Sequence, residues 1–463
     1  MAPHKIIIDT DPGVDDMVGL LLSLSASPEE LDILLISVTY GNVPLKNTLK
    51  NTVALFHVLE KELEWRKSVG RDEGYGAMRR SKPIVAVGPV HPLEEEELML
   101  DYFHGVDGLH NVYEAHPHLT PAETWKTLFH DETAADATSP FFTPSKTPGH
   151  KEILRILREE PADTVSILVW GPLTNIAIAA AEDPETLLKV KEVVVMGGAV
   201  HHEGNVTPVA EFNCYADPVA AARVYALTSK DPKSTMPPMP HKIPDGMHVL
   251  PPYPEKLSRT LKLTLCPLDI TTPHQFTRVE YNERIKPYLD AGSPLATWTA
   301  HFMDGCLRKC EDMEGEGAGL CLHDPFTVWY MLLHDDPAWK TPSQLEDIRV
   351  ETAGHWTKGM HVVDMRGKKD DSGEVVTASA PAKPEPQAEE EELTLEGDHV
   401  DHQSWRNPRG GNRIKRIISS PGFDVFKDFW MQRVYGISVC YRMHRQNLLT
   451  SEWPGPGWLR PGP

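Results

Sequence analysis

Short apolar runs rich in β-branched residues alternate with helix-like segments through the first half of the chain. The run at residues 6–8 is followed by an apolar stretch at 17–24, and the run within 31–42 by an amphipathic stretch at 45–61. Continuous apolar runs of this length are typical of strands buried on both faces. Because repeated strand–helix units build parallel sheets, we expect an α/β fold, doubly wound around a mainly parallel sheet, with helices on both faces.

Three stretches interrupt this rhythm. The first is rich in Pro, Thr and His, the second in Pro, and the third contains the acidic sequence PAKPEPQAEEEELTLEGD, which cannot bury enough apolar surface to fold. We therefore predict a single domain whose insertions lie in surface loops. Its predicted parts are residues 1–436 for the domain, insertions at about 110–150 and 230–258, a disordered linker at about 367–411, and an irregular tail at 437–463.

Composition limits the classes of protein that this chain can belong to. With 463 residues and 40% hydrophobic content, it can bury a sizeable core. A formal charge of −21 argues against a nucleic-acid partner, because phosphate backbones require a basic face. The six cysteines lack paired metal spacing and indicate a reducing compartment. Since we find neither a signal peptide nor an apolar run of membrane length, we expect a cytoplasmic protein with no membrane partner.

Four carboxylates crowd into the segment IIIDTDPGVDD, between the first predicted strand and the first helix. Such a turn lies at the carboxyl edge of the sheet, where ligands bind in open α/β folds. Carboxylates this close repel one another unless a cation lies among them, and ligand sets made only of oxygen suit Ca²⁺ or Mg²⁺. The alternative is a helix cap with acidic first-turn residues, which by itself explains Asp15 or Asp16.

Polar side chains also follow the other predicted strands. They come from the segments VTYGN, LVWGPLTN, GNVTPVAEFNCYADP and CLHDPF and comprise Asn42, Trp170, Asn205, Glu211, Asn213, His323 and Asp324. Amides and carboxylates grouped in this way can bind the hydroxyls of a sugar diol. Taken singly, each has an ordinary explanation, because Asn after a strand forms turns and His-Asp before a helix caps it.

Taken together and in order, these motifs resemble one family. DTDPGVDD, VTYGN, GPLTNIA, MGGAV, GNVTPVAEFNCYADP, HDP and TKGMHVVDMRG are similar to the motifs of the inosine-uridine preferring nucleoside hydrolases, over residues 1–436 with the insertions left out. The resemblance implies a Rossmann-like fold, Ca²⁺ at the strand ends, and hydrolysis of the N-glycosidic bond of ribonucleosides to ribose and free base. It also implies a homodimer or homotetramer.

The resemblance assigns the metal site residue by residue. It implies that Asp11, Asp16 and Asp324 are side-chain ligands of the calcium ion and that the backbone carbonyl of Trp170 completes the protein's share. Asp11 would also be the general base for the attacking water. Asp15 would hold the ribose 2′-hydroxyl.

The ribose site follows in the same way. Asn42 would steady the ribose end, and Asn205, Glu211 and Asn213 would bind its 3′- and 5′-hydroxyls. Asp324 would contact the substrate as well as the ion. Because positive charge builds on the ribose as the C1′–N bond breaks, nearby carboxylates favour the transition state over the ground state.

Two histidines are candidates for contact with the base. By resemblance His323 would be the acid that assists the leaving base, and His104, in FHGVDGLHN, would contact the base from a loop. A His can give up a proton near neutral pH. The alternatives are a structural His323 beside Asp324 and a solvated loop His104.

Two other classes of protein compete with this interpretation. DTD followed by a turn also resembles the phosphatase motif of the haloacid dehalogenase superfamily, although that interpretation leaves the Asn205–Asn213 cluster unused. A non-catalytic nucleoside-binding protein would use the same site without chemistry. Calcium-dependent release of ribose discriminates among the three.

Overall fold

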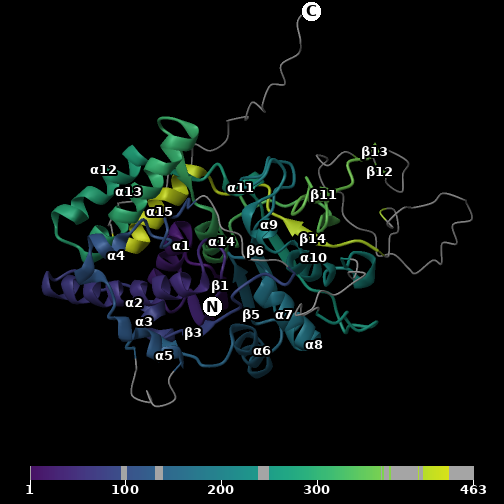
Figure 1. The fold of residues 1–463 in the computed structure, drawn as a ribbon, viewed down its shortest axis with the longest axis horizontal. Helices are drawn as coiled ribbons and strands as arrows, with labels where there is room; N and C mark the ends of the chain where they lie inside the picture. The colour runs from purple at the N-terminus through teal and green to yellow at the C-terminus, as the bar shows by residue number, and fades with distance from the viewer. Residues whose placement is uncertain are drawn as a thin grey trace, which may run out of the picture.

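Eight parallel strands form the central sheet, in the order β14-β7-β6-β5-β1-β2-β3-β4 (Figure 1). The computed structural model describes residues 2–94, 102–130, 139–237, 250–366, 368–369, 375–376, 405 and 410–436. The strands of this sheet are β1 (His4–Thr10), β2 (Leu31–Val38), β3 (Ile84–Val87), β4 (Thr143–Pro144), β5 (Val165–Val169), β6 (Glu192–Met196), β7 (Leu263–Cys266) and β14 (Ile414–Arg416).

The chain reverses its direction of winding between β1 and β5. From β1 it proceeds outward through β2 and β3 to β4, then returns to pair β5 with β1 and proceeds the other way to β14. The expected doubly wound parallel sheet is therefore confirmed. In such sheets the crevice at the carboxyl ends of the two strands flanking the reversal is the ligand site. Here these ends are Thr10 of β1 and Val169 of β5.

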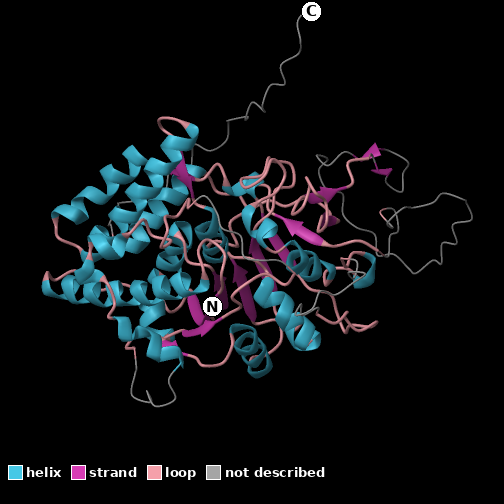
Figure 2. Ribbon diagram, in the orientation of Figure 1, coloured by secondary structure: helices cyan, strands magenta, loops and turns pink. Residues whose placement is uncertain are grey.

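Helices cover both faces of the sheet (Figure 2). One face carries α1 (Val14–Ser25), α2 (Leu45–Ser68), α3 (Gly76–Ser81), α13 (Pro294–Glu314), α14 (His323–Leu332) and α15 (Phe423–Tyr435), with α12 (Arg278–Asp290) packed on α13. The other face carries α6 (Gly149–Glu159), α7 (Thr174–Glu182), α8 (Pro184–Leu187) and α10 (Pro218–Ala226). None of the described helices combines the length and apolar character needed to cross a membrane.

The hydrophobic core is divided by the sheet into two clusters. Ile6 and Ile8 of β1 point to the cluster beneath α1, α2 and α14, whereas Ile7 points to the cluster beneath α6, α7 and α10. All three side chains are fully buried. This alternation explains why β1 is apolar at every position rather than at every second one.

The remaining elements are short. They are α4 (Val112–Ala115), α5 (Thr127–His130), α9 (Phe212–Ala216), α11 (Leu268–Thr271), the 3₁₀ helices η1 (Pro117–Leu119), η2 (Glu123–Lys126) and η3 (Pro232–Ser234), and three antiparallel pairs: β8 (Gln275–Thr277) with β9 (Gly319–Cys321), β10 (Ile348–Val350) with β11 (His361–Val363), and β12 (Lys368–Lys369) with β13 (Val375–Val376).

The insertion predicted at about 110–150 contains regular elements in its described residues, 110–130 and 139–150. They form α4, η1, η2, α5 and the edge strand β4, and the side chains of Leu119, Trp125, Phe129 and Phe142 are buried in the core. Residues 238–249 of the second predicted insertion, most of 367–411 and all of 437–463 lie outside the described residues, so the predictions for them stay predictions.

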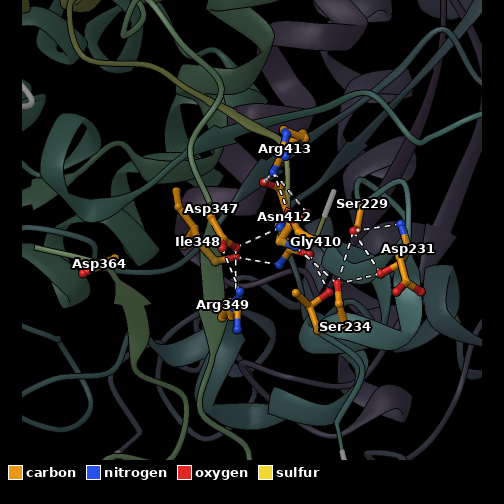
Figure 3. A network of polar contacts seen from close by, with 12 residues as sticks. Ser229, Asp231, Ser234, Asp347, Ile348, Arg349, Asp364, Gly410, Asn412 and Arg413 are labelled. Atoms are coloured by element: carbon orange, nitrogen blue, oxygen red, sulfur yellow. Dashed lines mark hydrogen bonds and ion pairs between the residues drawn. The ribbon is translucent and has the colours of Figure 1, made fainter. Parts of the chain in front are cut away.

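A polar network holds the chain where it returns to the sheet as β14 (Figure 3). The side chain of Asn412 donates to the carbonyl of Ile348 at 2.7 Å, and its backbone N–H donates to Asp347 at 2.8 Å. The backbone N–H of Arg413 donates to Thr228 at 2.9 Å. These bonds join residues far apart in sequence and fix β14 beside β7.

Candidate active site

The acidic turn lies at the carboxyl end of β1, as predicted. β1 ends at Thr10 and α1 begins at Val14, so the two are joined by a tight Asp-Pro-Gly turn. The buried Asp16 carboxylate organises this turn by accepting four hydrogen bonds, from the hydroxyl of Thr10 (2.5 Å), the backbone N–H groups of Asp11 (3.2 Å) and Gly13 (3.0 Å), and the amide of Asn42 (2.8 Å). These donors favour the charged form of Asp16.

Asp11 is held between two backbone segments. Its Oδ2 accepts the backbone N–H of Asn42 at 2.7 Å. A Cβ added to Gly41 would lie 2.0 Å from Oδ2, and one added to Gly171 would lie 2.7 Å from Oδ1, so only glycine fits at either position. Asn42 also binds the acidic turn through its side chain, whose Nδ2 lies 3.3 Å from the Asp11 carbonyl. Its predicted contact with ribose stays a prediction.

Three carboxylates meet beside this turn. Ligand oxygens of Asp15, Asp16 and Asp324 all lie within 4.8 Å of one another, and all three residues are buried. Burial, followed by the charge of Asp16, raises the pKa of Asp15 to about 8. Burial and the charges of Asp15, Asp16 and Asp11 raise the pKa of Asp324 well above its usual range. A cluster of this kind needs a compensating cation in order to be charged.

Two carboxylate oxygens at the acidic turn lack hydrogen-bond partners in the described part of the chain. Asp11 Oδ1 and Asp15 Oδ1 are buried and accept no hydrogen bond from any described residue. Buried carboxylate oxygens are almost always paired with donors or cations. Since the donor set contains oxygen alone, the residues fit a hard divalent cation such as Ca²⁺ or Mg²⁺. The sequence prediction grouped Asp11 with Asp16 and Asp324, whereas the tightest group in the structure contains Asp15.

The end of β5 reaches the same place. The carbonyl of Trp170 accepts a 2.5 Å hydrogen bond from Nδ2 of Asn213, so two residues predicted for the site are in contact. The Trp170 indole points away from the turn and donates to Thr327 of α14 at 2.6 Å. The carbonyl of Trp170 is thus available at the site edge while its side chain is part of the core.

Glu211 caps the N-terminus of helix α9 and is also buried. Its carboxylate accepts the backbone N–H groups of Gly198 (2.7 Å), Asn213 (2.8 Å) and Cys214 (3.1 Å). Asn205 accepts the backbone N–H of Phe212 at 2.9 Å. These residues therefore fix the shape of the segment after β6, a task that sequence reasoning did not assign to them.

The two predicted histidines lie near the cluster. His323 begins α14 beside Asp324, and its Nδ1 lies 2.8 Å from the hydroxyl of Thr271. Burial, followed by His202 and His274, lowers the pKa of His323 to about 4. His104 lies over the first turn of α1, and its Nε2 is 3.9 Å from Asp15. The structure thus places both histidines at the site; their roles stay predictions.

Sequence reasoning missed a buried pair behind the turn. Nδ2 of Asn175 donates to Asp9 at 2.7 Å and to Ser37 at 3.0 Å, which ties β1 to β2 and α7. Burial raises the pKa of Asp9 to about 7. Both residues stand inside the motifs DTDPGVDD and GPLTNIA, so the signal was present in the sequence without an assigned role.

Comparison with known proteins agrees with this geometry. The family model of the inosine-uridine preferring nucleoside hydrolases matches residues 6–385. The pyrimidine-specific ribonucleoside hydrolase RihA of Salmonella arizonae is 30% identical over 359 residues, which cover 78% of this chain and 88% of that protein, and the RihA of Escherichia coli K12 gives the same values.

Solved structures of nucleoside hydrolases share the fold. A plant nucleoside hydrolase superimposes with a TM-score of 0.61 at 21% identity, covering 94% of this chain and 100% of that one. The purine-preferring ribonucleoside hydrolase of Gardnerella vaginalis gives 0.61 at 19% identity, covering 93% and 98%. The family model matches most of this chain, and the acidic site lies at the reversal point of the sheet. The chain therefore belongs to the inosine-uridine preferring nucleoside hydrolase family.

Proposed function

We propose that this protein hydrolyses the N-glycosidic bond of ribonucleosides with the help of one calcium ion held by the acidic cluster. The observation that carries the proposal is the convergence of Asp15, Asp16 and Asp324 at the reversal point of the sheet, with oxygens of Asp11 and Asp15 left without donors. A hard divalent ion accepts several oxygen ligands, so carboxylates of the protein and the two hydroxyls of a vicinal diol can bind the same ion.

The chain offers its ligands in a prepared arrangement. Burial raises the pKa of Asp16, and its four hydrogen-bond donors oppose that shift and fix the orientation of the carboxylate, so it is ready to bind a cation without rearrangement. Asp324 approaches from the first turn of α14, and the carbonyl of Trp170 from the end of β5. A divalent cation held there lowers the pKa of a water molecule and offsets the charge of the carboxylates.

Asp11 is the proposed general base. One oxygen, Oδ2, is fixed by the backbone N–H of Asn42. The other, Oδ1, is buried and accepts no hydrogen bond from a described residue, so no donor competes for the position that a proton from water would take. A carboxylate with one oxygen fixed and one free can accept a proton from water in a defined direction. The positive charge that develops at C1′ is stabilised by the surrounding carboxylates, Asp15 among them.

Ribose recognition falls to the segment after β6. The Glu211 carboxylate accepts hydrogen bonds from three backbone N–H groups. Because an ionised carboxylate can accept about four, one position remains for a sugar hydroxyl. Asn213 is held against Trp170, close to the proposed metal site. Asn205 beside Phe212 and Asn42 beside Asp16 are the remaining proposed ribose contacts. Asp15 and Asp324 are the proposed partners of the diol.

The leaving base is the proposed partner of His323 and His104. Because burial favours the neutral form of both rings, we expect them to donate hydrogen bonds to the base rather than to carry charge. The base preference is best tested first with uridine and cytidine, since the relatives at 30% identity are named pyrimidine-specific.

The test is release of reducing sugar from uridine, cytidine, inosine, adenosine and 2′-deoxyuridine, with calcium and with a chelator. We expect release from a ribonucleoside that chelation abolishes, a much lower rate with 2′-deoxyuridine, and loss of activity in Asp11→Asn. Asp290→Asn, the same change at an exposed carboxylate, serves as the control. Folded, calcium-loaded protein that releases no ribose from any substrate would identify a non-catalytic binding protein instead.

The compartment and assembly remain part of the proposal. The five described cysteines form no disulfide, which supports a reducing, cytoplasmic location. We propose a homodimer or homotetramer in solution. Light scattering coupled to size exclusion measures the mass directly, and a monomer at micromolar concentration would contradict the oligomer.

A further inference from the structure

The loop of residues 102–113 packs on the acidic turn, and one buried amide forms hydrogen bonds with both segments. Asn51, fully buried in the second turn of α2, donates from Nδ2 to the carbonyl of Pro12 at 2.8 Å and to the carbonyl of Asp107 at 3.0 Å. Pro12 belongs to the acidic turn and Asp107 to the loop. A single side chain therefore joins the two segments.

The loop itself supplies the group that orients this amide. Tyr113 lies in the first turn of α4 and is buried, and its phenol donates a hydrogen bond to Oδ1 of Asn51. Since Oδ1 is engaged, both N–H groups of the amide face the two carbonyls, so all the polar groups involved are satisfied. Lys50 packs over the Tyr113 ring, with its Nζ 4.0 Å from the ring centre.

The loop is shaped to approach Asn51 closely. Gly108 has a φ of +87°, and a Cβ there would lie 2.7 Å from Nδ2 of Asn51, so only glycine permits the contact. The Asp107 side chain accepts the backbone N–H groups of Leu109 at 2.9 Å and Asn111 at 3.0 Å, which makes the loop tip internally rigid. It therefore docks as one body.

Docking of the loop determines where His104 lies. Nδ1 of His104 accepts the backbone N–H of Val14 at 3.1 Å, so in the neutral ring the hydrogen is on Nε2, which is 3.9 Å from Asp15. A Cβ on Gly13 would lie 2.9 Å from the His104 ring, so the ring is packed directly on the acidic turn. If the loop moved, His104 would leave the site.

We propose that Asn51, oriented by Tyr113, is a positioning residue that holds the His104 loop closed over the acidic turn. This inference rests on the proposed function, because it assigns Asn51 a part in the same reaction. The carboxylates beneath the loop are buried, so substrate must displace it to enter and the amide must rebuild its bonds before the site is complete. Asn51 thus sets the balance between entry and closure.

Variants separate positioning from simple stability. Tyr113→Phe keeps the ring and removes only the orienting bond, so we expect KM to rise roughly tenfold with kcat within about twofold. Asn51→Leu frees both the loop and the Pro12 turn, so we expect kcat to fall as well and kcat/KM to drop roughly 100-fold. Asn47→Ala is the matched control: one turn earlier on α2, the Asn47 side chain also bonds to the loop, but at the exposed carbonyl of Val106 and not to the Pro12 turn. It should leave both constants unchanged.

The double variant tests whether the two residues act as a unit. In the Asn51→Leu background, Tyr113→Phe should change kcat/KM less than twofold, because the bond it removes is already gone. Amide hydrogen exchange of residues 102–113 provides a readout independent of catalysis. In calcium-loaded protein without substrate, exchange should accelerate at least roughly tenfold in Asn51→Leu and remain normal in Asn47→Ala.

Two results would overturn the inference. One is a lowered melting temperature in Asn51→Leu with KM, kcat and exchange of the loop as in the wild type, which would show a merely structural residue. The other is an effect of Tyr113→Phe equal in the wild-type and Asn51→Leu backgrounds. If the wild type releases no ribose, the proposed function fails while the exchange experiment still tests whether Asn51 closes the loop.

Discussion

The indole nitrogen of Trp170 donates a 2.6 Å hydrogen bond to Oγ1 of Thr327, and that hydroxyl donates to the carbonyl of Asp324 at 2.8 Å. Trp170 directly follows β5, and its carbonyl also accepts a hydrogen bond from Asn213. One residue thus fixes the first turn of α14 on one side and the segment after β6 on the other. The distance between the proposed metal ligand Asp324 and the rest of the site depends on this chain of contacts.

Thr327→Val tests that chain. The change preserves shape but leaves the buried indole N–H without an acceptor, which costs about 1–3 kcal/mol of unfolding free energy. Because the first turn of α14 is then free to shift, we expect calcium affinity to fall about tenfold, as for residues that orient metal ligands. Calorimetric titration measures the affinity. Thr297→Val, at a helical threonine that bonds only its own helix, should leave it unchanged.

Asp15→Asn should have opposite effects with and without calcium. In chelated protein at pH 9, above the pKa of about 8 that burial gives Asp15, the change removes a buried negative charge beside Asp16, so we expect the melting temperature to rise by about 2 °C. In calcium-loaded protein it removes a proposed ligand or diol partner, so the stabilisation by calcium should shrink. Thermal unfolding with calcium and with chelator gives both values. A variant that is less stable than wild type under chelation would show that the carboxylates do not repel.

The fold and the location of the site could be predicted from local patterns. An apolar run predicts β1 and an apolar helical stretch predicts α1. The acidic turn joins the two, and in a parallel α/β sheet such a turn lies at the carboxyl edge of the sheet, where ligands bind. The helices of the segment at 110–150 could not be predicted, because helices of four residues are too short to show a hydrophobic period.

The sequence also could not predict which side chains of the site contact one another. Which of Asp11 and Asp15 turns toward Asp324 depends on rotamers, which contacts set only after the chain has folded. Asn51 lies within α2, where an isolated Asn usually faces solvent, and its partners Pro12 and Asp107 are 39 and 56 residues away in sequence. Only the assembled structure reveals such a residue.

Gly171→Ala should damage the metal site more than the fold. The added Cβ would lie 2.7 Å from Oδ1 of Asp11 and displace that carboxylate, so we expect calcium affinity to fall at least about tenfold. Gly292→Ala is the control: with a φ of +79° and open space around it, the substitution costs about 1–2 kcal/mol of stability. Its calcium affinity should equal that of the wild type, and equal losses in both variants would contradict the assignment.

Acid should weaken the fold through His361. This ring packs on Gly198, whose N–H binds Glu211, and its Nε2 lies 3.0 Å from the hydroxyl of Tyr225. Burial lowers its pKa to about 4 from the usual 6.5. The unfolded chain therefore binds the extra proton between these values, so the contribution of His361 is present above pH 6.5 and is lost as the pH falls toward 4, by at most about 3 kcal/mol.

Urea unfolding of the wild type and His361→Gln at several pH values isolates this effect from that of other groups. The free energy of unfolding of the wild type should fall more steeply than that of the variant between pH 6.5 and pH 4. Above pH 7 the difference between the two should be constant. Parallel curves throughout the acid range would show that His361 is not the responsible group.

The central claim is that the acidic cluster binds one calcium ion and that this ion is required for ribose release. The most direct measurement is a titration of chelator-treated protein with calcium, followed by calorimetry and by ribose release from a ribonucleoside in the same buffer. We predict one ion per chain and half-maximal activity at the calcium concentration that half-saturates the site, with both lost in Asp16→Asn. Full activity in calcium-free protein, or binding that leaves activity unchanged, would contradict the account.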